Sequence, residues 1–341
     1  MSRLMSRLVI GSLVCSVALV TAGGRSALAA PSTATVTDLG TIGFTSIIVD
    51  NTNHHVFVSG RTANVVDVLD FSGNLVTTIA DVYGAAGMAI NKGMLYVAES
   101  TAGTIARIHL KTLVRAKNLG SGLLQPYWLA ITGGELWVTV DVLNGWGQIE
   151  SVNVTSGNGT TFTTNYYSPD IVSSPGVPNT IFLAEDGLSP GSIYRLNVAS
   201  GTPVEVAGVS TNQENLEQIV VSADGKRLIP ASGWPYEFQE LSAKTLLPDG
   251  VIYPGQAYPA AVAVSSKGGG RLATGLTFGT PDLEVDPLGT PAPIFSITTN
   301  PSSPNVFPHG LALNTAGTEV FAVGGTGVYG SDAEIYMYSI S

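Results

Sequence analysis

A short hairpin is repeated seven times along this chain, and no other feature of the sequence constrains the fold as strongly. Its clearest copy occupies residues 217–229, where an apolar run ends at Ser222, Asp224 and Gly225 reverse the chain, and a second apolar run opens at Leu228. Two apolar runs separated by an Asp-Gly turn are typical of paired antiparallel strands. The chain is therefore expected to be built from many copies of one β-hairpin unit.

The spacing of the copies predicts a β-propeller. Aligned on the last residue of their first strand, the copies lie 41, 41, 42, 48, 43 and 49 residues apart. This is the length of a repeat that forms one four-stranded propeller blade. We therefore predict an all-β fold, a seven-bladed β-propeller of four-stranded antiparallel blades. The aligned positions are Val49, Ile90, Ile131, Ser173, Val221, Val264 and Leu313.

The last repeat contains one strand fewer than the others. Its third strand is residues 334–340, whereas residues 33–39, before the first copy, have the length and alternation of an unused strand. Pairing these two segments would close the ring and cover an otherwise exposed sheet edge. We predict that the N-terminal strand is the outer strand of the last blade.

Residues 1–29 have the character of a secretory signal peptide. Two arginines precede an apolar run, and an Ala-Leu-Ala cleavage site ends at Ala29. We therefore expect a secreted or extracytoplasmic protein with a single β-propeller domain over residues 30–341. The one cysteine, Cys15, lies within the segment that would be removed, so the mature chain would contain no disulfide.

The net charge disfavours nucleic acid and anionic membranes as partners. Residues 1–29 hold three arginines and no acids, so their removal changes the formal charge from −10 to −13. A chain this acidic repels other polyanions. We expect a monomer without membrane insertion, whose partner is a small molecule, a glycan or another protein.

Several repeats resemble those of known propeller families. Residues 56–69 and 216–230 look like the YVTN-type repeat, and residues 125–132 and 308–313 are similar to the NHL, streptogramin-lyase-like and gluconolactonase-like propellers. The resemblance covers scaffold positions, and fold likeness does not fix an activity. The main functional hypothesis is a binding or interaction module. The alternative that the last two families imply is a metal-assisted lyase or lactone hydrolase.

The predicted fold places candidate ligand-binding residues on one rim of the channel. In a propeller, the loops leading into the first strands and those joining the second and third strands meet there, and loops converging on a concavity commonly bind ligands. In this alignment that rim is acidic, with aromatic residues between the acids. The ligand-binding candidates are Arg61, Tyr127, Asp170, Glu217, Trp234 and Tyr236.

Two assignments of chemistry concern the same rim. Glu99, Asp141 and Glu185 offer the oxygen ligands that calcium prefers, so they are candidates for holding a divalent cation, although a solvated acidic rim is the simpler alternative. His309 precedes an inner strand and is the candidate general base, because the pKa of histidine lies near neutrality. Streptogramin-lyase-like enzymes use a histidine, whereas the sequence shows no partner for this one. The sequence therefore leaves open whether the protein is an enzyme.

Overall fold

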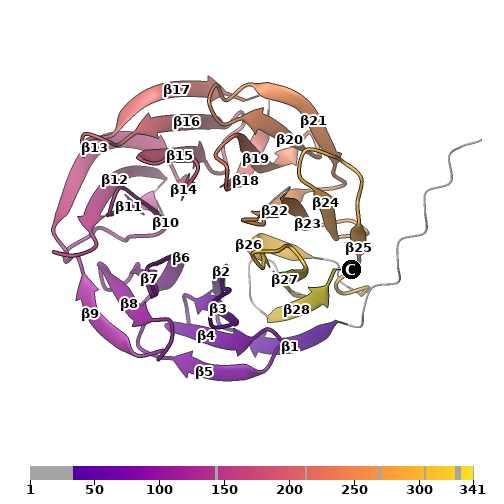
Figure 1. Ribbon diagram of the computed structural model, residues 1–341, viewed down its shortest axis with the longest axis horizontal. Helices are drawn as coiled ribbons and strands as arrows, with labels where there is room; N and C mark the ends of the chain where they lie inside the picture. The colour runs from indigo at the N-terminus through magenta and orange to yellow at the C-terminus, as the bar shows by residue number, and fades with distance from the viewer. Residues whose placement is uncertain are drawn as a thin grey trace, which may run out of the picture.

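The computed structural model describes residues 34–142, 145–211, 213–267, 270–302, 305–326 and 332–340. They form seven four-stranded antiparallel sheets, arranged as blades around a central channel (Figure 1). This arrangement confirms the predicted seven-bladed propeller. The predicted signal peptide lies outside the described residues. In the described part of the chain, no helix is long and apolar enough to cross a membrane.

The strands of each blade follow one another from the channel outward. Blades 1 to 3 are β2 (Phe44–Asp50), β3 (His55–Gly60), β4 (Val65–Asp70) and β5 (Leu75–Ile79); β6 (Ala85–Asn91), β7 (Met94–Glu99), β8 (Thr104–His109) and β9 (Arg115–Leu119); and β10 (Leu129–Thr132), β11 (Glu135–Val140), β12 (Trp146–Asn153) and β13 (Gly159–Tyr167). Blades 4 and 5 are β14 (Pro169–Ser173), β15 (Thr180–Glu185), β16 (Ser192–Asn197) and β17 (Val204–Ser210); and β18 (Glu214–Val221), β19 (Arg227–Trp234), β20 (Glu237–Ser242) and β21 (Pro248–Pro254). Blades 6 and 7 are β22 (Pro259–Val264), β23 (Arg271–Leu276), β24 (Leu283–Pro287) and β25 (Phe295–Ile297); and β26 (Val306–Leu313), β27 (Glu319–Gly324), β28 (Ala333–Ser339) and β1 (Thr35–Gly40).

The seven aligned positions of the repeat all fall in the innermost strands. These strands crowd around the channel axis, where small side chains fit best. β22 illustrates the rule, because its sequence is Pro-Ala-Ala-Val-Ala-Val and its first five residues are buried. The repeat therefore located the channel as well as the blades.

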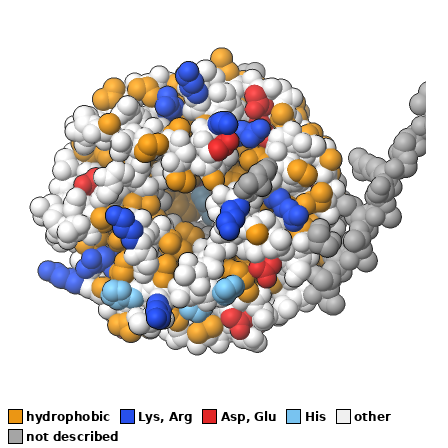
Figure 2. Space-filling view, in the orientation of Figure 1, with side chains coloured by type: hydrophobic (Ala, Val, Ile, Leu, Met, Phe, Trp, Pro, Cys, Tyr) orange, Lys and Arg blue, Asp and Glu red, His pale blue; other side chains and the backbone are white. Residues whose placement is uncertain are grey.

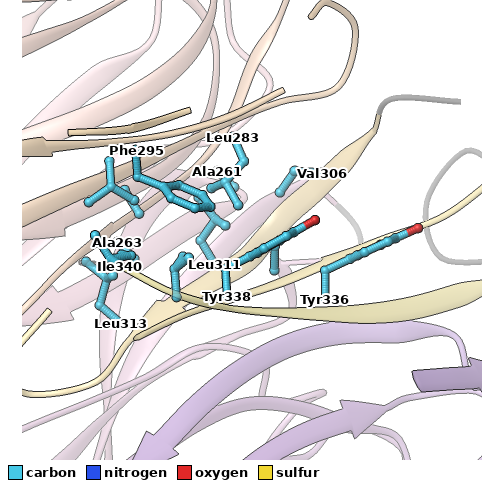
Figure 3. Close-up of a cluster of buried hydrophobic side chains, with 14 residues drawn as sticks. Ala261, Ala263, Leu283, Phe295, Val306, Leu311, Leu313, Tyr336, Tyr338 and Ile340 are labelled. Atoms are coloured by element: carbon cyan, nitrogen blue, oxygen red, sulfur yellow. The ribbon is translucent and has the colours of Figure 1, made fainter. Parts of the chain in front are cut away.

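The hydrophobic core lies between the blades. The described residues form seven buried clusters, and each is drawn from two neighbouring blades. Figure 3 shows the cluster between blades 6 and 7, where the rings of Phe295 and Tyr338 have centroids 5.4 Å apart. In five blades the second strand contributes a buried aromatic residue to such a cluster, as large ring area favours. These residues are Phe57, Tyr96, Trp137, Phe182 and Phe321.

The N-terminal strand closes the ring, as predicted. β1 pairs antiparallel with β28, and Thr35 lies opposite Met337. The order β1-β28-β27-β26 makes blade 7 from both ends of the described chain. The Thr37 hydroxyl also donates a hydrogen bond of 2.7 Å to the carbonyl of Gly73 in blade 1.

Irregularities in the inner strands all lie at one rim of the channel. Five inner strands, β2, β6, β18, β22 and β26, shift register near their first residues, whereas β10 and β14 pair regularly. Such bulges re-aim a side chain out of the ladder. Glu217 is skipped in β18, and His309, with a φ of 56°, lies within the irregular part of β26. The bulges therefore shape the rim to which the candidate residues belong.

Candidate functional site

A cavity of about 370 Å³ occupies the mouth of the channel at this rim. Its volume is within the range of small-molecule sites. The channel is visible face-on as a hollow at the centre of the ring in Figure 2. Asp186 lines the mouth cavity together with four of the predicted site residues. The four are Arg61, Tyr127, Glu217 and His309.

Backbone contacts between blades hold Tyr127 at the mouth. Its amide donates to the carbonyl of Thr139 at 2.9 Å, and its carbonyl accepts from the amide of Gly87 in blade 2 at 2.8 Å. A Cβ atom on Gly87 would lie 2.6 Å from that same carbonyl. Glycine is therefore required where the two blades approach each other beside the cavity.

The floor of the mouth cavity is a stacked pair of rings from two distant blades. Trp128 of blade 3 and His309 of blade 7 have centroids 3.9 Å apart and ring planes 26° apart. The amide of His309 donates to Oε1 of Gln218 at 3.2 Å, and the same oxygen accepts from the amide of Val262 at 3.1 Å. Both rings also line a deeper cavity of about 270 Å³. The stacked pair thus lies between two spaces in the channel.

Three carboxyl groups come from blades 4 and 5. Burial raises the pKa of Asp170, Asp186 and Glu217, and the charges of Glu217 and Asp170 raise that of Asp186 further. Asp170 lines the deeper cavity and accepts from the amide of Ile219 at 3.0 Å, while Glu217 accepts from the Tyr258 hydroxyl at 3.0 Å. The ion pairs between described residues involve none of the three carboxyl groups. This side of the channel therefore gathers three carboxyl groups without an ion-pair partner among the described residues, and burial favours their protonated forms.

Arg61 supplies a positive charge from the other side of the channel. It belongs to blade 1, which lies across the ring from blades 4 and 5 (Figure 1). Its guanidinium carbon lies 5.6 Å from the centroid of the Tyr127 ring, and its Nε donates to Oγ of Ser100 at 3.4 Å. Burial raises the pKa of Tyr127, Arg61 opposes that rise and Asp186 adds to it. The Tyr127 hydroxyl is thus subject to both charges.

His309 has the environment of a neutral imidazole. Burial lowers its pKa, although the charge of Asp170 opposes that effect. The ring hydrogen-bonds to the backbone of Glu217, while its Nε2 atom is buried and has no hydrogen-bond partner among the described residues. The bond to Glu217 is therefore made by Nδ1. A neutral histidine with an unused Nε2 can accept a proton from a bound molecule.

The structure places Trp234 and Tyr236 outside the mouth cavity. Both side chains are exposed, and their rings meet edge to face with centroids 5.3 Å apart. Trp234 lines a different cavity between blades 4 and 5. These two predicted ligand-binding residues are therefore not brought together with Arg61, Tyr127 and Glu217.

The residues predicted to hold a cation do not fit a metal site. The carboxylate of Glu99 forms an ion pair of 3.0 Å with Arg115 and accepts hydrogen bonds from Thr104 and Asn118. Glu185 accepts from the amide of Tyr167 and the hydroxyl of Tyr194. In the described part of the chain, no three His, Cys, Asp or Glu side chains are grouped so that they could hold a metal ion. Asp141 is therefore not grouped with Glu99 and Glu185 as a ligand set.

Two residues that line the deeper cavity, Trp128 and Gln218, were not among the predicted site residues. Trp128 follows Tyr127 directly, and Gln218 follows Glu217, so each lies beside a residue that was predicted. The alignment marked one residue per blade in the loops that enter the inner strands, besides residues in the loops that join the second and third strands. The neighbouring residue gains its role only from a contact across the ring, which no local pattern reports.

The comparisons with known proteins bear on the fold of this chain. No protein-family model and no curated protein matches the sequence. Its fold is similar to Kuenenia stuttgartiensis hydrazine synthase, with a TM-score of 0.66 and 16% identity over 89% of this chain and 98% of that chain. It is also similar to the RRP9 WD40 repeats, with a TM-score of 0.67 and 11% identity over 89% and 97% of the two chains, and to U3-55K, with a TM-score of 0.67 and 12% identity over 88% and 98%. At these identities the likeness shows the fold alone, a seven-bladed β-propeller.

Proposed function

We propose that this protein is an exported, monomeric binding module that takes a small molecule into the mouth of its central channel. One observation carries the proposal: residues from blades 1, 3, 4, 5 and 7 converge on a single cavity of about 370 Å³. Aromatic walls combined with a few convergent charged groups are typical of ligand sites. A YVTN-like or NHL-like blade sequence and an N-terminal signal peptide remain predictions that agree with this role.

The charge distribution favours a ligand that carries both signs. Arg61 presents planar donors suited to a carboxylate or phosphate on one side of the mouth. Asp186 and Glu217, on the opposite side, suit an ammonium group, because a cation there would relieve their mutual repulsion. Phe44 and Phe307, with ring centroids 6.0 Å apart, add apolar surface to the lining of the cavity. A zwitterion such as an amino acid or a short peptide meets all three requirements.

Retention of a small molecule tests the binding function. Purified protein is mixed with pooled amino acids, dipeptides and neutral metabolites, separated from unbound compounds by gel filtration, and analysed by mass spectrometry. We expect a zwitterion to be retained by the wild type and by the control Tyr83→Ala, whose exposed ring lies outside the cavity, but not by Tyr127→Ala. Retention of nothing would refute the binding function, whereas retention of neutral compounds alone would refute only the choice of ligand.

General-base chemistry at His309 is a second candidate, favoured by its unpartnered Nε2. The imidazole would remove a proton from a substrate or a water molecule in the mouth cavity. The predicted metal-assisted form of this chemistry lacks a fitting ligand set among the described residues, so no step is assigned to a metal. A panel of lactones and esters tests the idea. Turnover that His309→Gln abolishes would support it, and turnover unchanged in that variant would contradict it.

A further inference from the structure

A second cavity, of about 530 Å³, lies away from the channel, between the outer strands of blades 4 and 5. Its walls come from the end of β17, the turn before β18, and the strands β19 to β21. The cavity shares no lining residue with the mouth cavity. It is therefore a separate site, which the binding function proposed above does not use.

The side-chain amide of a buried glutamine that lines this cavity has no hydrogen-bond partner among the described residues. Gln213 is 4% exposed, and both its side-chain oxygen and its side-chain nitrogen lack hydrogen-bond partners among the described residues. Its backbone is fixed, because its amide donates to Oγ1 of Thr211 at 3.1 Å and its carbonyl accepts from the amide of Gly191 at 3.1 Å. An unsatisfied buried amide destabilises the folded protein. Such a group is explained if a ligand supplies both a donor and an acceptor.

An exposed aromatic platform lines the same cavity. The indole of Trp234 is 51% exposed, and the edge-to-face contact with Tyr236 supports it from one side. The Ser232 hydroxyl donates to the carbonyl of Trp234 at 2.9 Å, which fixes the backbone beneath the ring. A large exposed ring on an ordered strand end offers a flat apolar face at low entropic cost. Glu237 and Gln239 add polar groups beside it.

We infer that this cavity binds a neutral glycan, with one sugar ring stacked on Trp234 and hydroxyl groups paired with the Gln213 amide. The C–H face of a pyranose matches the flat indole. Neighbouring sugar hydroxyls both donate and accept, which is the complement that the amide of Gln213 lacks. The volume of the cavity accommodates one or two sugar units. A peptide segment would also satisfy an amide, but it would not require the flat exposed ring.

The test uses an array of neutral oligosaccharides, followed by calorimetric titration of the best binder. Trp234→Ala should weaken binding by at least about tenfold, as expected for an aromatic anchor. Gln213→Leu, which keeps the bulk of the side chain, should weaken it by about three- to tenfold. The matched control is Trp146→Ala, because Trp146 is 53% exposed and meets Tyr167 edge to face at 5.5 Å, but lines neither of the channel cavities nor this one.

Each outcome decides the inference. Binding that falls in Trp234→Ala and Gln213→Leu, and that persists in Trp146→Ala and Tyr127→Ala, supports a glycan site separate from the channel. No binder on the array, or equal loss in Trp146→Ala and Trp234→Ala, overturns it. Selective binding of short peptides in place of the sugars would also overturn the assignment to glycans. Loss of sugar binding in Tyr127→Ala alone would overturn the inference, because it would show that the glycan binds at the channel mouth.

Discussion

Deleting residues 31–40 should destabilise the folded protein, because this change removes β1 from blade 7. The register of β1 on β28 aligns five residue pairs. An antiparallel ladder contains on average about one hydrogen bond per pair, and each contributes about 1 kcal/mol net, so the pairing is worth about 5 kcal/mol. Burial adds little, since every residue of β1 is exposed or half-buried. The bond from Thr37 to Gly73 couples the loss to blade 1.

The expected change in melting temperature follows from the size of the protein. For a folded chain of about 300 residues, 1 kcal/mol shifts the midpoint by about 2 °C, so the deletion should lower it by about 10 °C. Differential scanning calorimetry and urea titration both measure this change. A midpoint within about 2 °C of the wild type would refute the assignment of a stabilising role to β1.

A relocated strand separates pairing from ring closure. β28 ends, at Ser339, on the rim where β1 begins, since Thr35 lies opposite Met337. Residues 34–40 can therefore be moved to the C-terminus behind an Asn-Gly turn, which would let them pair with β28 as a hairpin. This variant keeps the fourth strand of blade 7 but removes its covalent link to blade 1. We expect it to recover part of the lost stability, and full recovery would show that the link itself contributes nothing.

Two further predictions concern buried side chains. Trp137→Ala should lower the free energy of unfolding by about 3–5 kcal/mol in urea titrations, because the ring is 1% exposed and packs between blades 3 and 4. A loss no larger than that caused by Trp146→Ala, at an exposed ring, would contradict this prediction. Burial and the charge of Glu284 raise the pKa of Asp286 to about 7. The stability that the Asp286 carboxyl group contributes is therefore fully present below the unfolded pKa of about 4 and is lost as the pH rises through 7. Asp286→Asn should therefore raise the melting temperature at pH 8 and leave it little changed at pH 4, and equal changes at both pH values would contradict the shift.

The fold could be predicted because its determinants are local and repeated. An Asp-Gly turn between two apolar runs specifies a hairpin within about ten residues, and seven copies at blade length leave few architectures open. Closure could be predicted for a similar reason. An unpaired edge is unfavourable, and residues 33–39 were the one spare segment with the right alternation. Both inferences needed only the pattern and the number of the strand-like segments, which can be read from the sequence.

The site could be predicted only in part, because its geometry depends on contacts across the ring. Tyr127, Glu217 and His309 were predicted from their place at the start of an inner strand, and all three line the mouth cavity. The stack of Trp128 on His309 joins blades 3 and 7, and no periodicity encodes such a contact. Glu99 looked available for a cation in the sequence, but Arg115 lies within 3.0 Å of it in the fold.

The bulges explain how the inner strands present side chains at this rim. Each bulge interrupts a ladder and leaves a residue unpaired, so five of them in the inner strands reduce the regularity of the scaffold. Blade 3 has the same irregularity just before β10, where Tyr127 and Trp128 both hydrogen-bond to Thr139, so among the seven inner strands of the described chain only β14 lacks one. All five lie at the mouth, and two of them hold Glu217 and His309 at the cavity. Because six of the seven blades share it, the irregularity belongs to the scaffold, and the loop residues that differ between blades give the mouth cavity its chemical character.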